Sequence, residues 1–167
     1  MDLLEGIYSR RSIRQYIGQP VDKSLLLEII RAGAWAPSGL NNQPWRFAIV
    51  QEQGWRNKLA QCTRYGRIIE AASACIVVFV DRNAMYHDVK DYQAIGACLQ
   101  NMLLATHALG LGAVWLGEIL NSSSKVRSLL DLPEELELMA VIAVGYPDTH
   151  NKSSHRKELA EMIVKEL

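Results

Sequence analysis

Apolar residues recur along this chain in two patterns, at helical spacing in some segments and in short continuous runs in others. The helical spacing predicts helices over residues 3–10, 23–36, 53–71, 91–109 and 124–130. The continuous runs predict strands over residues 46–51, 74–80, 113–116 and 137–146. Residues 151–167 are expected to form either a C-terminal helix or an extended arm. Helices and strands alternate without a strict βαβ rhythm, which predicts an α+β fold with one central sheet and helices on its faces.

The helix expected over residues 91–109 is apolar nearly all the way round. A helix of this kind is buried on several sides. In a chain of 167 residues we expect its extra apolar face to pack against a second subunit, with burial inside one core as the alternative. Gly110 and Gly112 follow this helix and are expected to end it, with Gly112 as the capping residue, because glycine readily adopts the left-handed conformation common there.

Length and composition indicate one globular domain over residues 1–167, with 49% apolar and 22% charged residues. The 18 basic and 18 acidic side chains cancel, whereas proteins that hold nucleic acid by its phosphates carry a basic excess, so no nucleic-acid partner is expected. No apolar run approaches the roughly 20 residues that span a bilayer, and the acidic start lacks a signal peptide, so we expect a cytoplasmic protein without membrane contact. Three widely spaced cysteines and the lack of metal-ligand spacing predict neither disulfides nor a metal site.

Residues 10–14 read Arg-Arg-Ser-Ile-Arg and concentrate three guanidinium groups and one hydroxyl. Arginine presents paired N–H donors that match phosphate oxygens, and serine adds a compact donor. The segment therefore fits a phosphate group, and a solvated charged surface is the alternative.

Residues 37–45 read Pro-Ser-Gly-Leu-Asn-Asn-Gln-Pro-Trp between an expected helix and an expected strand. Their hydroxyl and amide groups can read the edge of a heterocycle by hydrogen bonds without adding charge. An ordinary turn is the alternative, since serine, glycine and asparagine are common turn residues.

Residues 110–118 (GLGAVWLGE) carry three glycines. They follow a helix and open a strand, which is the reverse of the order in a dinucleotide-binding fingerprint, so that interpretation is rejected. Gly117 lies at the far end of the strand, where the lack of a Cβ lets backbone approach a ligand closely.

Taken together and in order, these segments resemble the nitroreductase family of FMN-dependent oxidoreductases. The motifs are R-R-S-I-R-x-Y, then A-P-S-G-x-N-x-Q-P-W, then W-L-G-E, then G-Y-P followed by an arginine, and they extend from about residue 5 to residue 157. The resemblance implies a nitroreductase-like fold with a central mixed sheet flanked by helices, and a homodimer with FMN at the subunit interface. It also implies that the loop over residues 37–43 reaches the flavin of the partner subunit.

The resemblance assigns the cofactor-binding roles residue by residue. The cluster at 10–14 and a C-terminal arginine would hold the FMN phosphate and ribityl end, the loop at 37–43 would flank the flavin, and the backbone at 116–118 would donate an N–H toward N5. The residues are Arg10, Arg11, Ser12, Arg14, Pro37, Ser38, Gly39, Asn41, Gln43, Leu116, Gly117, Glu118 and Arg156. Gly39 departs from the family pattern, because a second serine or alanine is common there.

The implied activity is reduction of nitroaromatic or quinone-type acceptors with NADH or NADPH, by ping-pong hydride transfer through flavin N5. No side chain is assigned a catalytic role, and Tyr86 and His87 are candidates on the substrate side. Only residues 81–90 separate the second strand from the long helix, where family members with a full pocket carry a helical insertion, so we expect broad acceptor specificity. The alternative is that the partner subunit or residues 157–167 fold over the flavin and replace this insertion. The alternatives are other chemistry on the same fold, of a dehalogenase or flavin-consuming type, and a non-catalytic FMN-binding or redox-sensing module.

Overall fold

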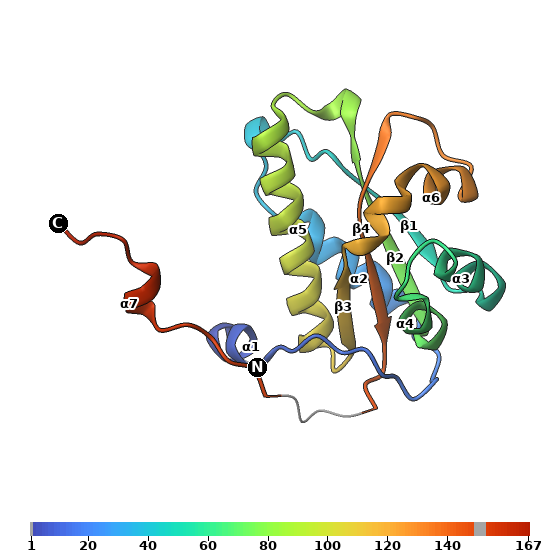
Figure 1. Cartoon of the computed structure of the whole chain (residues 1–167), viewed down its shortest axis with the longest axis horizontal. Helices are drawn as coiled ribbons and strands as arrows, with labels where there is room; N and C mark the ends of the chain where they lie inside the picture. The colour runs from blue at the N-terminus through green and yellow to red at the C-terminus, as the bar shows by residue number, and fades with distance from the viewer. Residues whose placement is uncertain (1, 149–152) are drawn as a thin grey trace.

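A four-stranded sheet forms the centre of the protein in the computed structural model, which describes residues 2–148 and 153–167 (Figure 1). The strands are β1 (Trp45–Val50), β2 (Ala74–Asp81), β3 (Gly112–Leu116) and β4 (Leu136–Gly145), in the order β1-β2-β4-β3. The predicted α+β class with a central sheet is confirmed. All three strand pairings are antiparallel, so the parallel component of the expected mixed sheet is a single bridge between Ser12 and Ala113.

The helices agree with the predicted segments except over residues 53–71. They are α1 (Leu3–Ser9), α2 (Lys23–Ala34), α3 (Gln53–Ala60), α4 (Gly66–Ala71), α5 (Asp88–Ala108), α6 (Ser123–Leu129) and α7 (Leu159–Met162), with 3-10 turns η1 (Gly39–Asn41), η2 (Arg82–Ala84) and η3 (Glu118–Ser122). The single helix expected over 53–71 is two helices joined by a turn. Within the described residues, no helix combines the length and the apolar character needed to cross a membrane.

The C-terminal segment is an extended arm that carries one short helix, α7, and it projects away from the body of the molecule (Figure 1). The first part of the segment expected over 151–167 lies outside the described residues. All of residues 153–167 are exposed.

Helices cover both faces of the sheet and divide the core into two clusters. On β2, Ile76, Val78 and Val80 pack toward α2 and α5, while alternate residues such as Val77 and Phe79 pack in the cluster that α3, α4 and α6 complete. Side chains of a strand point alternately to the two faces of a sheet, so a strand buried on both sides needs apolar residues at every position. This explains why β2 reads as a continuous apolar run rather than as an alternating one.

The end of α5 differs from the prediction, because Gly110 and not Gly112 terminates the helix. Gly110 has a φ of +75°, and its N–H donates to the carbonyl of His107 at 3.1 Å. The next N–H, of Leu111, donates to the carbonyl of Thr106 at 3.0 Å, which completes the hydrogen-bond pair of a glycine-terminated helix. Gly112 is needed for space instead, since a Cβ there would lie 2.7 Å from Cγ2 of Ile13.

Gly112→Ala is expected to destabilise the fold by about 1–3 kcal/mol, because the added methyl group overlaps the buried Ile13 side chain. Urea unfolding measures the change. Gly54→Ala is the matched control, since the atom nearest its Cβ would be the Glu52 carboxylate at 3.2 Å, at the end of an exposed side chain. Equal losses in the two variants would contradict this account of Gly112.

Candidate functional site

The arginine-rich segment 10–14 is fixed to the end of the sheet by its one apolar residue. Ile13 is buried, and its N–H donates to the carbonyl of Ala113 on β3 at 2.9 Å. Ser12 forms the parallel bridge to the same residue. Burial of Ile13 therefore holds the flanking polar residues in place beside β3.

These polar residues line a cavity of about 320 Å³ together with residues of the C-terminal arm. The lining residues are Arg10, Arg11, Ser12, Arg14, Ser153, Ser154 and Arg156. Four of the seven carry a guanidinium group and none carries a carboxylate, so the cavity is strongly cationic. The sequence-predicted phosphate residues, including Arg156 from the far end of the chain, thus come together in one place.

Arg10 is the least satisfied member of this group. Its buried Nε and Nη1 atoms donate to no acceptor among the described residues. Burial lowers the pKa of the Arg10 guanidinium, and the nearby charges of Arg156 and Arg11 lower it further. A buried donor without an acceptor costs roughly 1–3 kcal/mol, and more when it is charged. A bound anion such as a phosphate would remove that cost, so the residues present fit a phosphorylated cofactor.

The neighbouring arginines already donate to backbone carbonyls. Nη1 of Arg11 donates to the carbonyls of Tyr8 at 2.6 Å and Arg10 at 3.0 Å, and Nη1 of Arg156 donates to the carbonyl of His155 at 2.9 Å. Nη1 of Arg156 also contacts the Ser154 hydroxyl. These bonds orient the guanidinium groups and add no negative charge to the cavity.

The second predicted segment, around η1, is a strained loop. Leu40, Asn41 and Gln43 all have positive φ values, of 54°, 54° and 46°. The Ser38 hydroxyl accepts from the N–H of Gln43 at 3.1 Å, and the Gln43 side-chain amide donates to the carbonyl of Asn41 at 3.2 Å. Left-handed residues other than glycine are uncommon, and local strain of this kind gathers at functional sites. Pro37, Asn41 and Gln43 are exposed, while Ser38 and Gly39 are half-buried.

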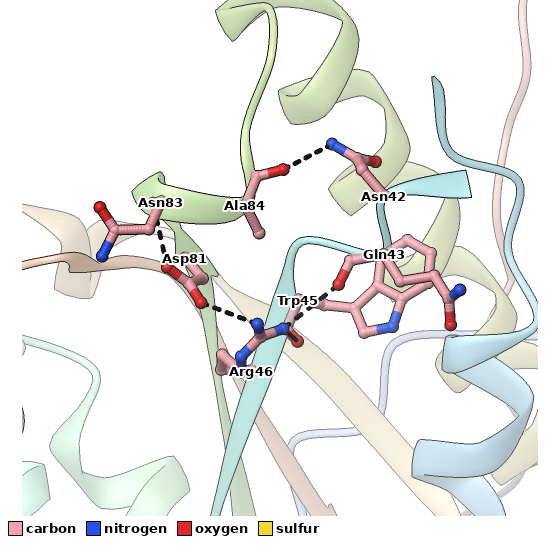
Figure 2. A network of polar contacts seen from close by, with 7 residues as sticks. All are labelled: Asn42, Gln43, Trp45, Arg46, Asp81, Asn83 and Ala84. Carbon is pink, nitrogen blue, oxygen red and sulfur yellow. Dashed lines mark hydrogen bonds and ion pairs between the residues drawn. The ribbon is translucent and has the colours of Figure 1, made fainter. Parts of the chain in front are cut away.

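Two residues that the sequence analysis missed hold this loop. Nδ2 of Asn42 donates to the carbonyl of Ala84 at 2.9 Å (Figure 2) and to Oδ1 of Asp91 at 2.7 Å. Asp91 is fully buried in the first turns of α5, and its Oδ2 accepts from the N–H groups of Tyr86 and His87 at 2.9 Å each. One carboxylate therefore ties the η1 loop, the connection after β2 and α5 into one unit. The sequence showed an acidic residue near the start of a long helix, but it did not show that this residue pairs with Asn42, 49 residues earlier in the chain.

The electrostatics of Asp91 follow from these contacts. Burial raises the pKa of the carboxyl, but the hydrogen bonds from Asn42, His87 and Tyr86 outweigh it, so that the pKa lies below its ordinary value. Asp91 therefore remains an anion at neutral pH despite its burial.

Arg46, on β1, also holds the end of the η1 loop in place (Figure 2). Its Nη2 lies 2.7 Å from Oδ2 of Asp81, and its Nη1 donates to the carbonyls of Gln43 and Trp45 at 3.2 and 2.8 Å. In Figure 2 the side-chain amide of Gln43 points away from this network. The Gln43 backbone is thus held while its amide stays at the surface.

The third predicted segment lies at the end of β3. Its Glu118 side chain makes hydrogen bonds within the chain, whereas Gly117 has no close packing contact. The Glu118 carboxylate accepts from the Thr63 hydroxyl at 2.5 Å and from the N–H of Arg64 at 3.2 Å, and these contacts hold its pKa below the usual range. The side chain therefore positions the turn between α3 and α4. A Cβ at Gly117 would meet nothing closer than Nε1 of Trp115 at 3.9 Å, so packing within the chain does not require a glycine there.

Within one chain the three segments do not form a single pocket. The η1 loop bonds to Asp91 near the start of α5, whereas Ser9, beside the arginine cluster, pairs with His107 near its end, with 2.8 Å between Oγ and Nε2. The 16 residues from Asp91 to His107 span about 24 Å at the helical rise per residue. By contrast, β3 carries the chain only about 13 Å from Ala113, beside Ser12, to Gly117. The arginine cluster and residues 116–118 thus lie along one strand, and the η1 loop lies apart.

Tyr86 and His87, the substrate-side candidates, lie in a connection shorter than expected. Because β2 continues to Asp81 and α5 begins at Asp88, only residues 82–87 join them, rather than a loop over 81–90. Tyr86 is 42% exposed, and its ring centroid lies 6.4 Å from that of His87.

Comparison with known proteins is consistent with this arrangement. The family model described as "Nitroreductase family" matches residues 7–65 and 51–146. A provisionally named NADH dehydrogenase/NAD(P)H nitroreductase of Archaeoglobus fulgidus is 34% identical over 149 residues, covering 87% of this chain and 86% of that protein. The NADPH-flavin oxidoreductase of Vibrio harveyi is 32% identical over 157 residues, covering 87% and 65%. A crystal structure of a provisionally named nitroreductase of Desulfovibrio desulfuricans in complex with FMN is 48% identical, with a TM-score of 0.94 and coverage of 100% and 98%.

Asp91→Asn is expected to lower stability at neutral pH by about 1–3 kcal/mol, because it removes a charged acceptor from three donors. The folded-state pKa is depressed, so the contribution of the carboxylate is complete above its unfolded pKa of about 3.9 and is lost as the pH falls through the folded value. The gap in urea stability between the wild type and the variant should therefore close in acid. Asp88→Asn, at an exposed position on the same turn, is the control, and a gap that stays constant with pH would refute this role of Asp91.

Proposed function

The chain belongs to the nitroreductase family, and on this basis we propose that it uses FMN to reduce nitroaromatic or quinone-type acceptors with NADH or NADPH. The observation that carries the proposal is that the buried Nε and Nη1 atoms of Arg10 have no acceptor among the described residues, in a cavity lined by four arginines. The FMN complex of the similar Desulfovibrio protein supports the choice of cofactor.

The arginine cavity would hold the FMN phosphate. In this assignment Arg10, Arg14 and Arg156 bind phosphate oxygens, Ser12 donates from its hydroxyl, and Arg11 supports the cluster through its bonds to the backbone. Hydrogen bonds between guanidinium groups and phosphate are charge-assisted and therefore stronger than neutral ones. Residues 116–118 lie about 13 Å farther along β3, so in this assignment the ribityl chain and the ring would extend toward them, and their backbone could donate an N–H to N5.

FMN, when bound, would supply the redox chemistry: it would accept a hydride from NADH or NADPH and reduce a quinone to a hydroquinone by two electrons and two protons, one proton coming from the hydride and the other from solvent. The chain binds and orients the ring for this reaction. A backbone N–H donor at residues 116–118 would stabilise negative charge on the reduced ring. No side chain is required as a nucleophile.

We propose that the site is completed by a second copy of the chain. The η1 loop and the arginine cluster lie about 24 Å apart along α5, so two chains packed in opposite directions along this helix would bring the loop of one beside the cluster of the other. An apolar groove of about 480 Å³ between α1, α2 and α5 offers a surface for such packing. Trp35 and Leu40, which are 83% and 86% exposed, would be covered by the same contact.

The short connection over residues 82–87 favours a broad range of acceptors. A pocket wall discriminates between substrates by shape and by paired polar groups, and little protein is present here to form one. The redox chemistry of the acceptor and its ability to stack on the flavin would then decide the rate.

Arg10→Ala and Arg156→Ala should each weaken FMN binding about tenfold to a hundredfold, the equivalent of charge-assisted hydrogen bonds worth about 1.5–3 kcal/mol. Titration of apoprotein with FMN, followed by flavin fluorescence, measures the affinity. Arg31→Ala is the control, since Arg31 pairs with Glu28 on the exposed surface of α2. Unchanged affinity in both cluster variants would refute the phosphate assignment. Anaerobic bleaching of the bound flavin by NADH or NADPH separates an oxidoreductase from a non-catalytic FMN-binding module.

The shared site predicts complementation between two defective chains. Sedimentation should give twice the 18.7 kDa chain mass. Heterodimers of Arg10→Ala and Gln43→Ala chains, isolated with two affinity tags, should regain one tight FMN site per dimer, because the intact cluster of one chain meets the intact loop of the other. If each site were built within one chain, both sites of the heterodimer would stay defective.

A further inference from the structure

The ring of Tyr86 is seated directly on the backbone of the η1 loop. A Cβ built on Gly39 would lie 1.9 Å from Oη, 2.4 Å from Cε1 and 2.5 Å from Cζ of Tyr86. Real Cβ atoms essentially never approach other atoms so closely, so the position of the ring requires a glycine at residue 39. Gly39 does not have a positive φ, so its backbone conformation does not require glycine. Space for Tyr86 is therefore the reason for glycine at this position.

The backbone of Tyr86 and its ring have separate contacts. The Tyr86 N–H donates to Asp91 at 2.9 Å, and the same carboxylate receives the Asn42 side chain of the η1 loop at 2.7 Å. Nζ of Lys90, in the first turn of α5, lies 5.4 Å from the centroid of the Tyr86 ring, within the range of a cation–π contact. The backbone of Tyr86 and the loop on which its ring rests thus share one buried anchor.

The ring also remains open to a ligand. Tyr86 is 42% exposed although one edge is covered by Gly39. Exposed polar groups of the same loop, Asn41 and Gln43, lie two and four residues from Gly39. A molecule stacked beside a flavin held by this loop would therefore meet the exposed part of the Tyr86 ring.

We propose that Tyr86, seated on Gly39, forms the aromatic wall of the acceptor site and makes the enzyme favour planar aromatic acceptors over non-planar ones. The inference rests on the proposed function. Within the planar class the enzyme stays permissive, because one ring selects for flatness and not for substituents. Gly39 and Tyr86 act as a pair, since a larger residue at position 39 displaces the ring.

The direct test is binding of a redox-inactive planar probe to oxidised, FMN-loaded protein. We expect 2-naphthoate to bind more tightly than its saturated analogue decahydro-2-naphthoate in calorimetry. Tyr86→Leu should reduce that preference about two- to tenfold, which is the range of aromatic pair contacts, and Tyr86→Phe should retain it. Trp55→Leu is the control, because Trp55 is a similarly exposed aromatic residue on α3, away from the η1 loop. A preference unchanged in Tyr86→Leu would overturn the inference.

The paired role of Gly39 is tested by a double-mutant cycle. Gly39→Ala should lose the same preference as Tyr86→Leu, and the double variant should lose no more than either alone. Independent, additive losses would overturn the pairing. FMN content is read from the absorbance of each variant before titration. A wild type that binds the planar probe selectively but is not reduced by NADH or NADPH would refute the proposed function, and a reducible wild type whose probe preference ignores Tyr86 would refute this inference alone.

Discussion

Two buried donor atoms of Arg10, which have no acceptor in the part of the chain that the structure describes, are the constraint on which the rest of this site depends. Nε and Nη1 of Arg10 are enclosed, and the nearby charges of Arg11 and Arg156 add repulsion to the cost of burial. A chain does not gain stability from such an arrangement by itself. What keeps it in place is apolar packing beside it, because Ile13 is buried against β3 and Gly112 leaves the space for it. Core packing thus provides the free energy that holds an electrostatically incomplete site ready for an anion.

The long helix α5 sets the spacing of the other parts. Asp91 near its start binds the η1 loop and the connection after β2, and His107 near its end pairs with Ser9 beside the arginine cluster. A straight helix keeps its two ends a fixed distance apart, so the η1 loop and the arginine cluster cannot come into contact within one chain. The sequence shows each of these parts clearly, and the length of the helix between them supports the proposal that a second copy of the chain joins them.

The sequence predicted the elements of the sheet well because β2 and β4 are apolar runs buried on both faces, a signal that is local. The prediction failed where the role of a residue depends on contact with a segment that is distant in the chain. Gly112 was expected to end α5, yet Gly110 does so, and only contact with Ile13 across 99 positions explains Gly112. Asn42 and Asp91 were missed for the same reason, since neither residue indicates its partner. The arginines at 10–14 were predicted from their own chemistry, whereas Arg156 was foreseen through a family resemblance, which carries long-range information that hydrophobic spacing lacks. Ser153 and Ser154, which line the same cavity, were not predicted.

The short connection after β2 and the glycine at position 39 together determine where the Tyr86 ring lies. With only residues 82–87 between Asp81 and Asp88, the chain has no room for a separate covering helix, and a ring in that connection must rest on whatever lies beneath it. The surface beneath is the η1 loop, and it accepts the Tyr86 ring only because residue 39 has no side chain.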